Sequence, residues 1–199
     1  MDEVIMSLYR EDILNIYRQD LPWNKLSGTN ILVTGATGLI GGCLVETLMM
    51  NPKRDYHLYA SGRNEQRARE RFKDYADDKA FHFVRYDVLE PLDSDVCFDY
   101  IIHAASNANP KFYATQPVEV MKANINGVSN LISYGLEHNM KRFLYVSSGE
   151  VYGEGDGRVL RRIIVAMWIV RSRVLVIPLP NGRQKLFVLL MLKNLVRMW

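Results

Sequence analysis

Acidic residues are missing from the last fifth of this 199-residue chain. Residues 159–199 contain eight Lys or Arg and no Asp or Glu, whereas residues 1–158 contain 17 basic and 22 acidic side chains. Because the net charge of +3 comes from one end, it gives no reason to expect a nucleic-acid partner. The change of composition predicts a boundary near residue 158, followed by an aberrant basic and apolar tail.

Cysteine is scarce, and long apolar runs are absent. Cys43 and Cys97 form no CxxC or Cys/His pattern, so no disulfide framework or metal site is predicted, and a reducing cytoplasm is the expected location. The apolar runs of the tail are "IIVAMWIV", "VLVIPLP" and "LFVLLML". All are shorter than the ~20 residues of a membrane-spanning helix, so we expect no membrane span.

The first 23 residues are too acidic and too interrupted for a signal peptide. Their spacing predicts an amphipathic helix within an N-terminal extension over 1–28, packed on the domain that follows. Its apolar positions are Val4, Ile5, Leu8, Ile13, Ile16 and Tyr17.

From residue 30 the sequence alternates short apolar runs with helical patterns. Strands are predicted at 30–35, 56–61, 80–86, 98–105 and 142–148, and helices at 38–51, 64–76 and 117–138. Strands separated by helices indicate parallel βαβ units. The predicted fold of residues 29–158 is therefore an α/β, Rossmann-like, doubly wound parallel sheet that is incomplete at its C-terminus.

The segment "TGATGLIG" places Gly35, Gly38 and Gly41 between the first strand and the first helix. Glycine permits a positive φ at the turn and lets a diphosphate approach the backbone, whose N–H groups at the helix start attract negative charge. The alternative is a plain tight turn, but the strand-turn-helix context favours dinucleotide binding.

Asp87 directly follows a buried strand, at the edge of the sheet where such folds bind ligands. It is a candidate ligand-binding carboxylate, and the alternative is a cap of a turn or helix. His57, His82 and His138 have no acid or thiol partners in the pattern and are interpreted as surface or structural residues.

Several ordered motifs together resemble the extended short-chain dehydrogenase/reductase family over about residues 28–158. They are the glycine spacing, "YDV" at 86–88, "HAAS" at 103–106, Asn124 in "KANINGVSNL" and "SSGEVYG" at 147–153. Members of that family include nucleotide-sugar epimerases, 4,6-dehydratases and UDP-glucuronate decarboxylases. The resemblance implies a nucleotide-sugar substrate and leaves a homodimer open.

The same resemblance implies a role for each matching residue. Asp87 and Val88 would hold the adenine of NAD, and Ser148 would hydrogen-bond the reacting sugar oxygen, with Glu150 as a second catalytic residue. The diphosphate would lie on Gly35, Thr37, Gly38, Leu39, Ile40 and Gly41, and His103, Ala104, Ala105, Ser106 and Asn124 would line the cofactor crevice.

Two departures bear on the type of enzyme. The second strand ends in "YASGRN", without the carboxylate that usually binds the NAD ribose, and Arg63 could face a 2′-phosphate, so NADP stays open beside NAD. The alternative for Arg63 is a solvated helix start. Gly149 stands where dehydratases of the family have an Asp, whereas Glu150 is retained, and this favours a decarboxylase.

The Tyr-x-x-x-Lys pair that resemblance places after Ser148 is missing, since residues 159–199 contain no tyrosine. If the codons of the tail are read one base out of frame, those of residues 167–169 must encode Val-Asp. Those from residue 176 onward can encode "YPxSKRAAE", which contains Tyr-x-x-x-Lys at the expected distance from Ser148. We interpret the tail as frameshifted; coding DNA without Tyr-x-x-x-Lys in the shifted frame would contradict this. The alternative takes the tail at face value, as a membrane-surface or partner-docking segment.

These patterns predict the dinucleotide-binding half of an NAD(P)-dependent nucleotide-sugar epimerase, dehydratase or decarboxylase, inactive as written. The alternative is a non-catalytic dinucleotide-binding protein whose basic tail docks on a membrane or partner. A third outcome is a chain that does not fold stably, because its sheet would lack cover.

Overall fold

The computed structural model describes residues 3–106 and 115–147, with side chains from Ser7 onward. The chain divides into two compact units, residues 1–106 with 126–146 and residues 107–125 with 147–199. Ser148, Glu150 and the tail lie outside the described residues, so the predicted boundary at residue 158 and the frameshift stay predictions.

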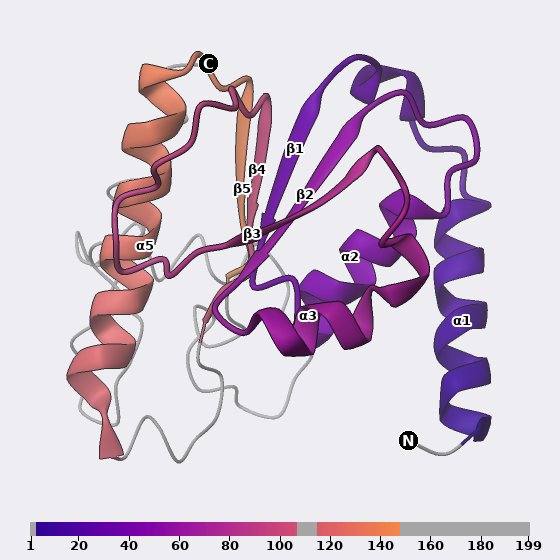
Figure 1. Ribbon diagram of the computed structural model, residues 1–199, viewed down its shortest axis with the longest axis horizontal. Coiled ribbons are helices and arrows are strands. Elements are labelled where there is room, and N and C mark those ends of the chain that lie inside the picture. The colour runs from indigo at the N-terminus through magenta and orange to yellow at the C-terminus, as the bar shows by residue number, and fades with distance from the viewer. Residues whose placement is uncertain (1–2, 107–114, 148–199) are drawn as a thin grey trace, which may run out of the picture. The chain divides into compact units, whose positions relative to one another are not determined.

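Five parallel strands form the sheet of the first unit (Figure 1). They are β1 (Asn30–Thr34), β2 (His57–Gly62), β3 (Phe81–Arg85), β4 (Tyr100–His103) and β5 (Arg142–Tyr145). Their order is β3-β2-β1-β4-β5, and β1 pairs with β2 on one side and β4 on the other. The predicted α/β, Rossmann-like parallel sheet is confirmed.

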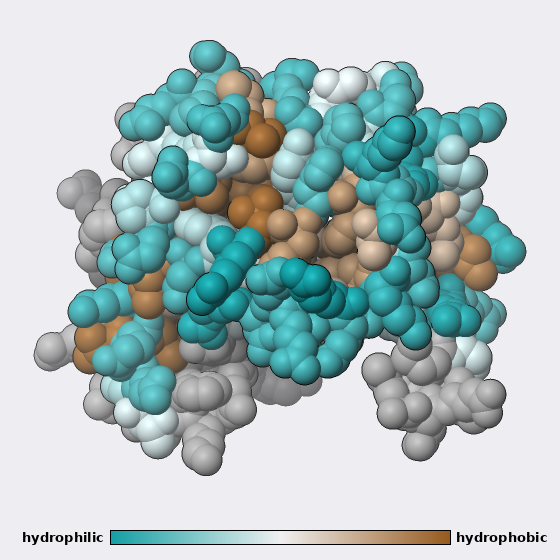
Figure 2. All heavy atoms as spheres, viewed as in Figure 1, coloured by the Kyte–Doolittle hydropathy of each residue, from teal (hydrophilic) through white to brown (hydrophobic). Residues whose placement is uncertain are grey.

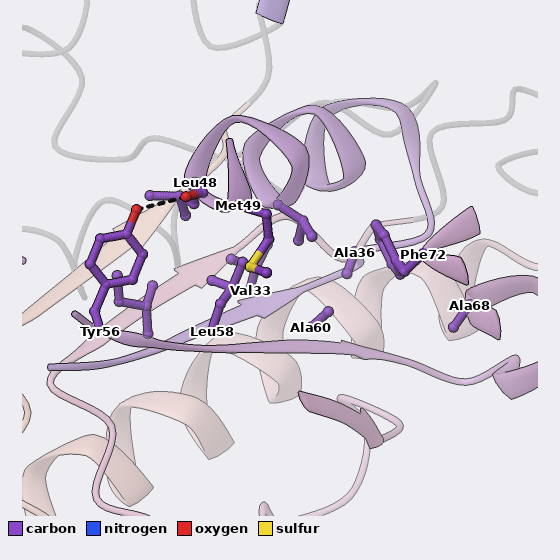
Figure 3. Close-up of a cluster of buried hydrophobic side chains, with 11 residues drawn as sticks. Val33, Ala36, Leu48, Met49, Tyr56, Leu58, Ala60, Ala68 and Phe72 are labelled. Atoms are coloured by element: carbon purple, nitrogen blue, oxygen red, sulfur yellow. Dashed lines mark hydrogen bonds between the residues drawn. The ribbon is translucent and has the colours of Figure 1, made fainter. Parts of the chain in front are cut away.

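One face of the sheet packs against α2 (Leu39–Met49) and α3 (Glu65–Arg71). The alternation of β1 directs Ile31 and Val33 to this face, because successive side chains of a strand point to opposite sides. Figure 3 shows Leu48 and Met49 over Val33 and Leu58, with the Tyr56 hydroxyl donating to the Leu48 carbonyl oxygen at 2.7 Å.

The opposite face carries a second apolar cluster. Leu32 and Ile101 of the two central strands pack there with Phe98 and with Leu131 and Tyr134. The last two belong to α5 (Pro117–Glu137), whose residues from Asn126 onward are part of the first unit. The two layers bury β1 and β4 on both sides, which explains their nearly continuous apolar sequence.

Two predicted helices differ in detail. In α1 (Glu3–Tyr17), Ile13 is buried, but Leu8 and Ile16 are 55% and 40% exposed, so the predicted apolar face is partly wrong. The helix predicted at 64–76 ends at Arg71, because Phe72 leaves helical geometry and buries its ring in the first cluster. Short 3₁₀ turns follow at Lys73–Tyr75 (η2) and precede β1 at Trp23–Leu26 (η1).

Hydrophilic side chains lie over α3 on the face shown in Figure 2, as its charged sequence predicts. Along the described ranges 3–106 and 115–147, no helix has the length and apolar character needed to cross a bilayer.

Candidate functional site

The candidate site lies at the carboxyl ends of β1 and β4. The chain leaves β1 toward β2 on one side, whereas β4 starts the other half of the sheet, so their carboxyl ends form a topological switch point. Open α/β sheets bind ligands at such a point. The glycine-rich segment follows β1 there, and the "HAAS" segment follows β4.

Gly35 lies directly against the segment that follows β4. Its φ is +68°, and a Cβ built on it would lie 2.6 Å from the Ala104 carbonyl oxygen and 2.7 Å from the Ala105 Cα. Any side chain would therefore push two backbones apart at the switch point. The structure thus brings the predicted residues Gly35, Ala104 and Ala105 together.

The other two glycines shape the start of α2. The Gly38 N–H donates to the Gly35 carbonyl oxygen at 2.9 Å, and Gly38 caps the helix without a side-chain hydrogen bond. A Cβ on Gly41 would overlap that same Gly35 carbonyl group. The turn therefore closes on itself and leaves the first N–H groups of α2 without a side-chain cap.

The remaining predicted loop residues surround this helix start. Leu39 and Ile40 are 77% and 54% exposed, although both are large and apolar. The side chain of Thr37 lies near Gly62 at the end of β2, where a Cβ would make ordinary contact at 3.6 Å. The exposed apolar pair lies at the predicted diphosphate position.

Asp87 and Arg63 face each other across the ends of β3 and β2. A guanidinium nitrogen of Arg63 lies 3.9 Å from a carboxylate oxygen of Asp87, and the side chains are 63% and 38% exposed. Asp87 also accepts the Leu89 N–H at 3.1 Å, so one of its oxygens caps a turn, while its predicted role in binding adenine stays a prediction. Its second oxygen is the one that faces Arg63.

Val88 and His103 are held by α5 from the side opposite to α2. Asn130 donates to the Val88 carbonyl oxygen at 3.0 Å, and a Cβ on Gly127 would lie 3.1 Å from Val88 and 3.4 Å from His103 Nε2. Gly127 and Asn130 were not predicted; only their position one helical turn apart could have indicated a shared face.

His103 is fully buried and hydrogen-bonds through Nδ1 to the Thr34 hydroxyl at 2.7 Å, between paired residues of β4 and β1. Its Nε2 has no hydrogen-bond partner along the described ranges. Burial lowers the pKa of His103 from 6.5 to about 4. The imidazole is therefore a neutral link between the two central strands.

Four predicted residues are not among those that the structure brings together at this site. Ser106 is exposed at the end of the "HAAS" segment, and Asn124 lies on α5 within the second unit. Ser148 and Glu150 are outside the described residues, so their catalytic roles stay predictions. Along residues 7–106 and 115–147, no three His, Cys, Asp or Glu side chains are grouped as metal ligands.

Arg71 is a further residue beside the glycine-rich loop that the sequence did not predict. It lies in α3, three residues after the buried Ala68, and its guanidinium donates to the Gly38 carbonyl oxygen at 3.0 Å. Its sequence lies within a charged surface helix, and only helical spacing from Ala68 and Phe72 marks it as inward-facing.

The residues at this switch point fit the diphosphate of a dinucleotide. Two backbones touch at Gly35 where a Cβ would intrude, and the N–H groups that open α2 lack a side-chain cap. Such N–H groups and the positive end of the helix dipole attract an anion.

Comparison with protein families gives a match of residues 31–162 to the NAD dependent epimerase/dehydratase family. UDP-glucuronic acid decarboxylase 6 of Arabidopsis thaliana is 37% identical over 132 residues, which cover 64% of this chain and 36% of that protein. UDP-glucuronic acid decarboxylase 1 of Xenopus tropicalis is 34% identical over 165 residues, covering 78% and 37%. The chain thus spans little more than a third of these relatives.

Among solved structures, dTDP-glucose 4,6-dehydratase from Bacillus anthracis in complex with NAD superposes with a TM-score of 0.55 at 19% identity. The superposition covers 66% of this chain and 41% of the dehydratase. It confirms the Rossmann-like fold.

Proposed function

Because the chain belongs to the NAD-dependent epimerase/dehydratase family, we propose that its first unit is the NAD-binding half of a nucleotide-sugar enzyme of the decarboxylase type. The observation that carries the proposal is the contact of Gly35 with the Ala104–Ala105 backbone beside the uncapped start of α2. UDP-glucuronic acid is the proposed sugar nucleotide, by similarity to the curated decarboxylases.

Each part of the crevice would hold one part of the cofactor. The N–H groups at the start of α2 would bind the diphosphate, while the apolar side chains of Leu39 and Ile40 border it. Asp87 would accept a hydrogen bond from the adenosine, with one carboxylate oxygen already engaged by Leu89. NAD supplies a reversible hydride acceptor when bound.

Arg63 makes the choice between NAD and NADP measurable. Its exposed guanidinium is attracted by Asp87 at 3.9 Å, and the end of β2 offers no carboxylate for a ribose hydroxyl. The family favours NAD, so we expect NAD to bind more tightly than NADP. Arg63→Ala should weaken NADP more than NAD if the guanidinium contributes to 2′-phosphate binding.

We further propose that the 199 residues bind NAD without completing turnover. Ser148 would orient the sugar hydroxyl, but no tyrosine follows Tyr152 that could remove its proton, and Tyr152 is not followed by lysine four residues later.

Calorimetric titration with NAD and NADP, followed by incubation with UDP-glucuronic acid and NAD, tests both proposals. We expect saturable NAD binding and no release of carbon dioxide. Absence of NAD binding contradicts the proposed site, and carbon dioxide release above a no-protein control contradicts the proposed inactivity.

A further inference from the structure

Arg71 reaches from α3 to the carbonyl side of the glycine-rich loop. One guanidinium nitrogen donates to the Gly38 carbonyl oxygen at 3.0 Å and lies 3.4 Å from the Thr37 carbonyl oxygen. The side chain is 23% exposed, which is low for an arginine on a charged surface helix. Its outer neighbours on α3 are the hydrophilic residues seen in Figure 2.

The other guanidinium nitrogens are held by two more helices. Nε donates to a Glu46 carboxylate oxygen of α2 at 3.0 Å, and a terminal nitrogen donates to the Tyr9 hydroxyl of α1 at 3.0 Å. The carboxylate is only 18% exposed, so the pair is shielded from solvent on both sides. Three helices therefore fix the position of one cation behind the loop.

Gly42 provides the space for this cation. It lies one helical turn after Gly38, and a Cβ on Gly42 would overlap the guanidinium carbon and nitrogens of Arg71. The neighbouring Gly41 instead faces the Gly35 backbone. The Gly42 N–H also donates to the Gly38 carbonyl oxygen at 3.0 Å, as any residue there could, so it is the missing side chain of Gly42 that makes room for Arg71.

The planarity of the peptide bond connects this contact with the ligand side of the loop. In a trans peptide the C=O and the following N–H point in opposite directions. The Gly38 carbonyl oxygen accepts from both Arg71 and the Gly42 N–H, at 3.0 Å each, so the Leu39 N–H of the same peptide points away from Arg71. The preceding peptide behaves in the same way: its Thr37 carbonyl oxygen faces Arg71, and its Gly38 N–H points to the Gly35 carbonyl oxygen.

We propose that Arg71 is a positioning residue for the cofactor site: it fixes the peptide planes of Thr37 and Gly38 so that the N–H groups opening α2 face the diphosphate. Arg71 lies behind the loop and does not itself contact the ligand. The inference rests on the proposed NAD site and deepens it.

Titration calorimetry of the full chain with NAD and with adenosine tests the role of Arg71. In Arg71→Leu we expect the Kd for NAD to rise about tenfold, equivalent to about 1.4 kcal/mol. Adenosine has no phosphate to sense the loop, so its affinity should stay within about twofold of wild type. Arg69→Leu is the matched control, because Arg69 lies in the same helix, is 78% exposed and, among the residues that the structure describes, pairs only with Glu65.

Gly42→Ala is the second variant, since it removes no hydrogen-bonding group and alanine favours a helix over glycine. It should displace the guanidinium and weaken NAD while the chain stays folded, and it decides the question if Arg71→Leu does not fold. The inference about Arg71 is overturned if folded Arg71→Leu or Gly42→Ala binds NAD with wild-type affinity. It is also overturned if the affinity for adenosine falls as much as the affinity for NAD. Neither result contradicts the proposed function. Failure of the wild-type chain to bind NAD overturns the proposed function together with it.

Discussion

Acidification should destabilise the first unit through one buried histidine. His103 is fully buried between β1 and β4, with Nδ1 bonded to Thr34 and Nε2 directed toward Gly127 without a partner along the described ranges. Protonation would place a charged N–H where the structure offers no acceptor and no solvent. The folded protein therefore resists a proton that the unfolded chain binds readily.

The sign and size of the effect follow from the pKa values. Burial lowers the pKa of His103 from 6.5 in the unfolded chain to about 4 in the fold. The contribution of the neutral imidazole to stability is thus fully present above pH 6.5 and is lost progressively as the pH falls from 6.5 to about 4. Linkage gives a loss of about 2 kcal/mol at pH 5 and about 3 kcal/mol at pH 4, relative to neutral pH.

Urea unfolding of wild type and His103→Asn, followed by far-ultraviolet circular dichroism between pH 7 and pH 5, measures this loss. Asparagine can still bond Thr34 but cannot titrate, so its free energy of unfolding should fall by about 2 kcal/mol less over that range. His138→Gln, a change in a less buried histidine, should keep the wild-type dependence. Parallel curves for wild type and His103→Asn would refute the reasoning.

Two further predictions concern the loop and its supports. Gly41→Ala should raise the Kd for NAD by more than about tenfold, because its Cβ meets the Gly35 backbone, which cannot swing aside. Gly62→Ala should bind NAD with normal affinity, and titration of both variants checks this. Tyr9→Phe should raise the Kd for NAD about threefold in the same assay, because it removes one neutral partner of Arg71, and an unchanged Kd would separate α1 from the cofactor site.

The strands and the glycine-rich turn could be predicted from local sequence. Each strand is a short apolar run. The turn between the first strand and the first helix requires glycine for local geometric reasons, so Gly35, Gly38 and Gly41 can be recognised from the local sequence alone. The fold class followed from the alternation of these patterns, and the structure confirms it. The catalytic roles of Ser148 and Glu150 rest on resemblance and stay predictions.

The residues that were missed depend on contacts between distant segments. Arg71 is chemically like its neighbours in α3, and only the fold brings it to Gly38, 33 positions earlier in the chain. Leu8 and Ile16 of α1 fit an apolar stripe but stay exposed, while Tyr9 makes the contact with Arg71. Periodicity predicts that a helix has an inner face, but the neighbouring elements determine which of its side chains make contacts there.

The glycine-rich loop is therefore supported from two sides by different means. Toward β4 it touches the backbone of Ala104 and Ala105, which no change of rotamer can move. Toward α3 it is held by the end of a long side chain, which can be displaced while the helices stay folded. Gly41 and Gly42 are adjacent, yet the first is required by the geometry of the turn and the second only by Arg71. Substitution of Gly41 should thus damage both folding and NAD binding, whereas substitution of Gly42 should separate them.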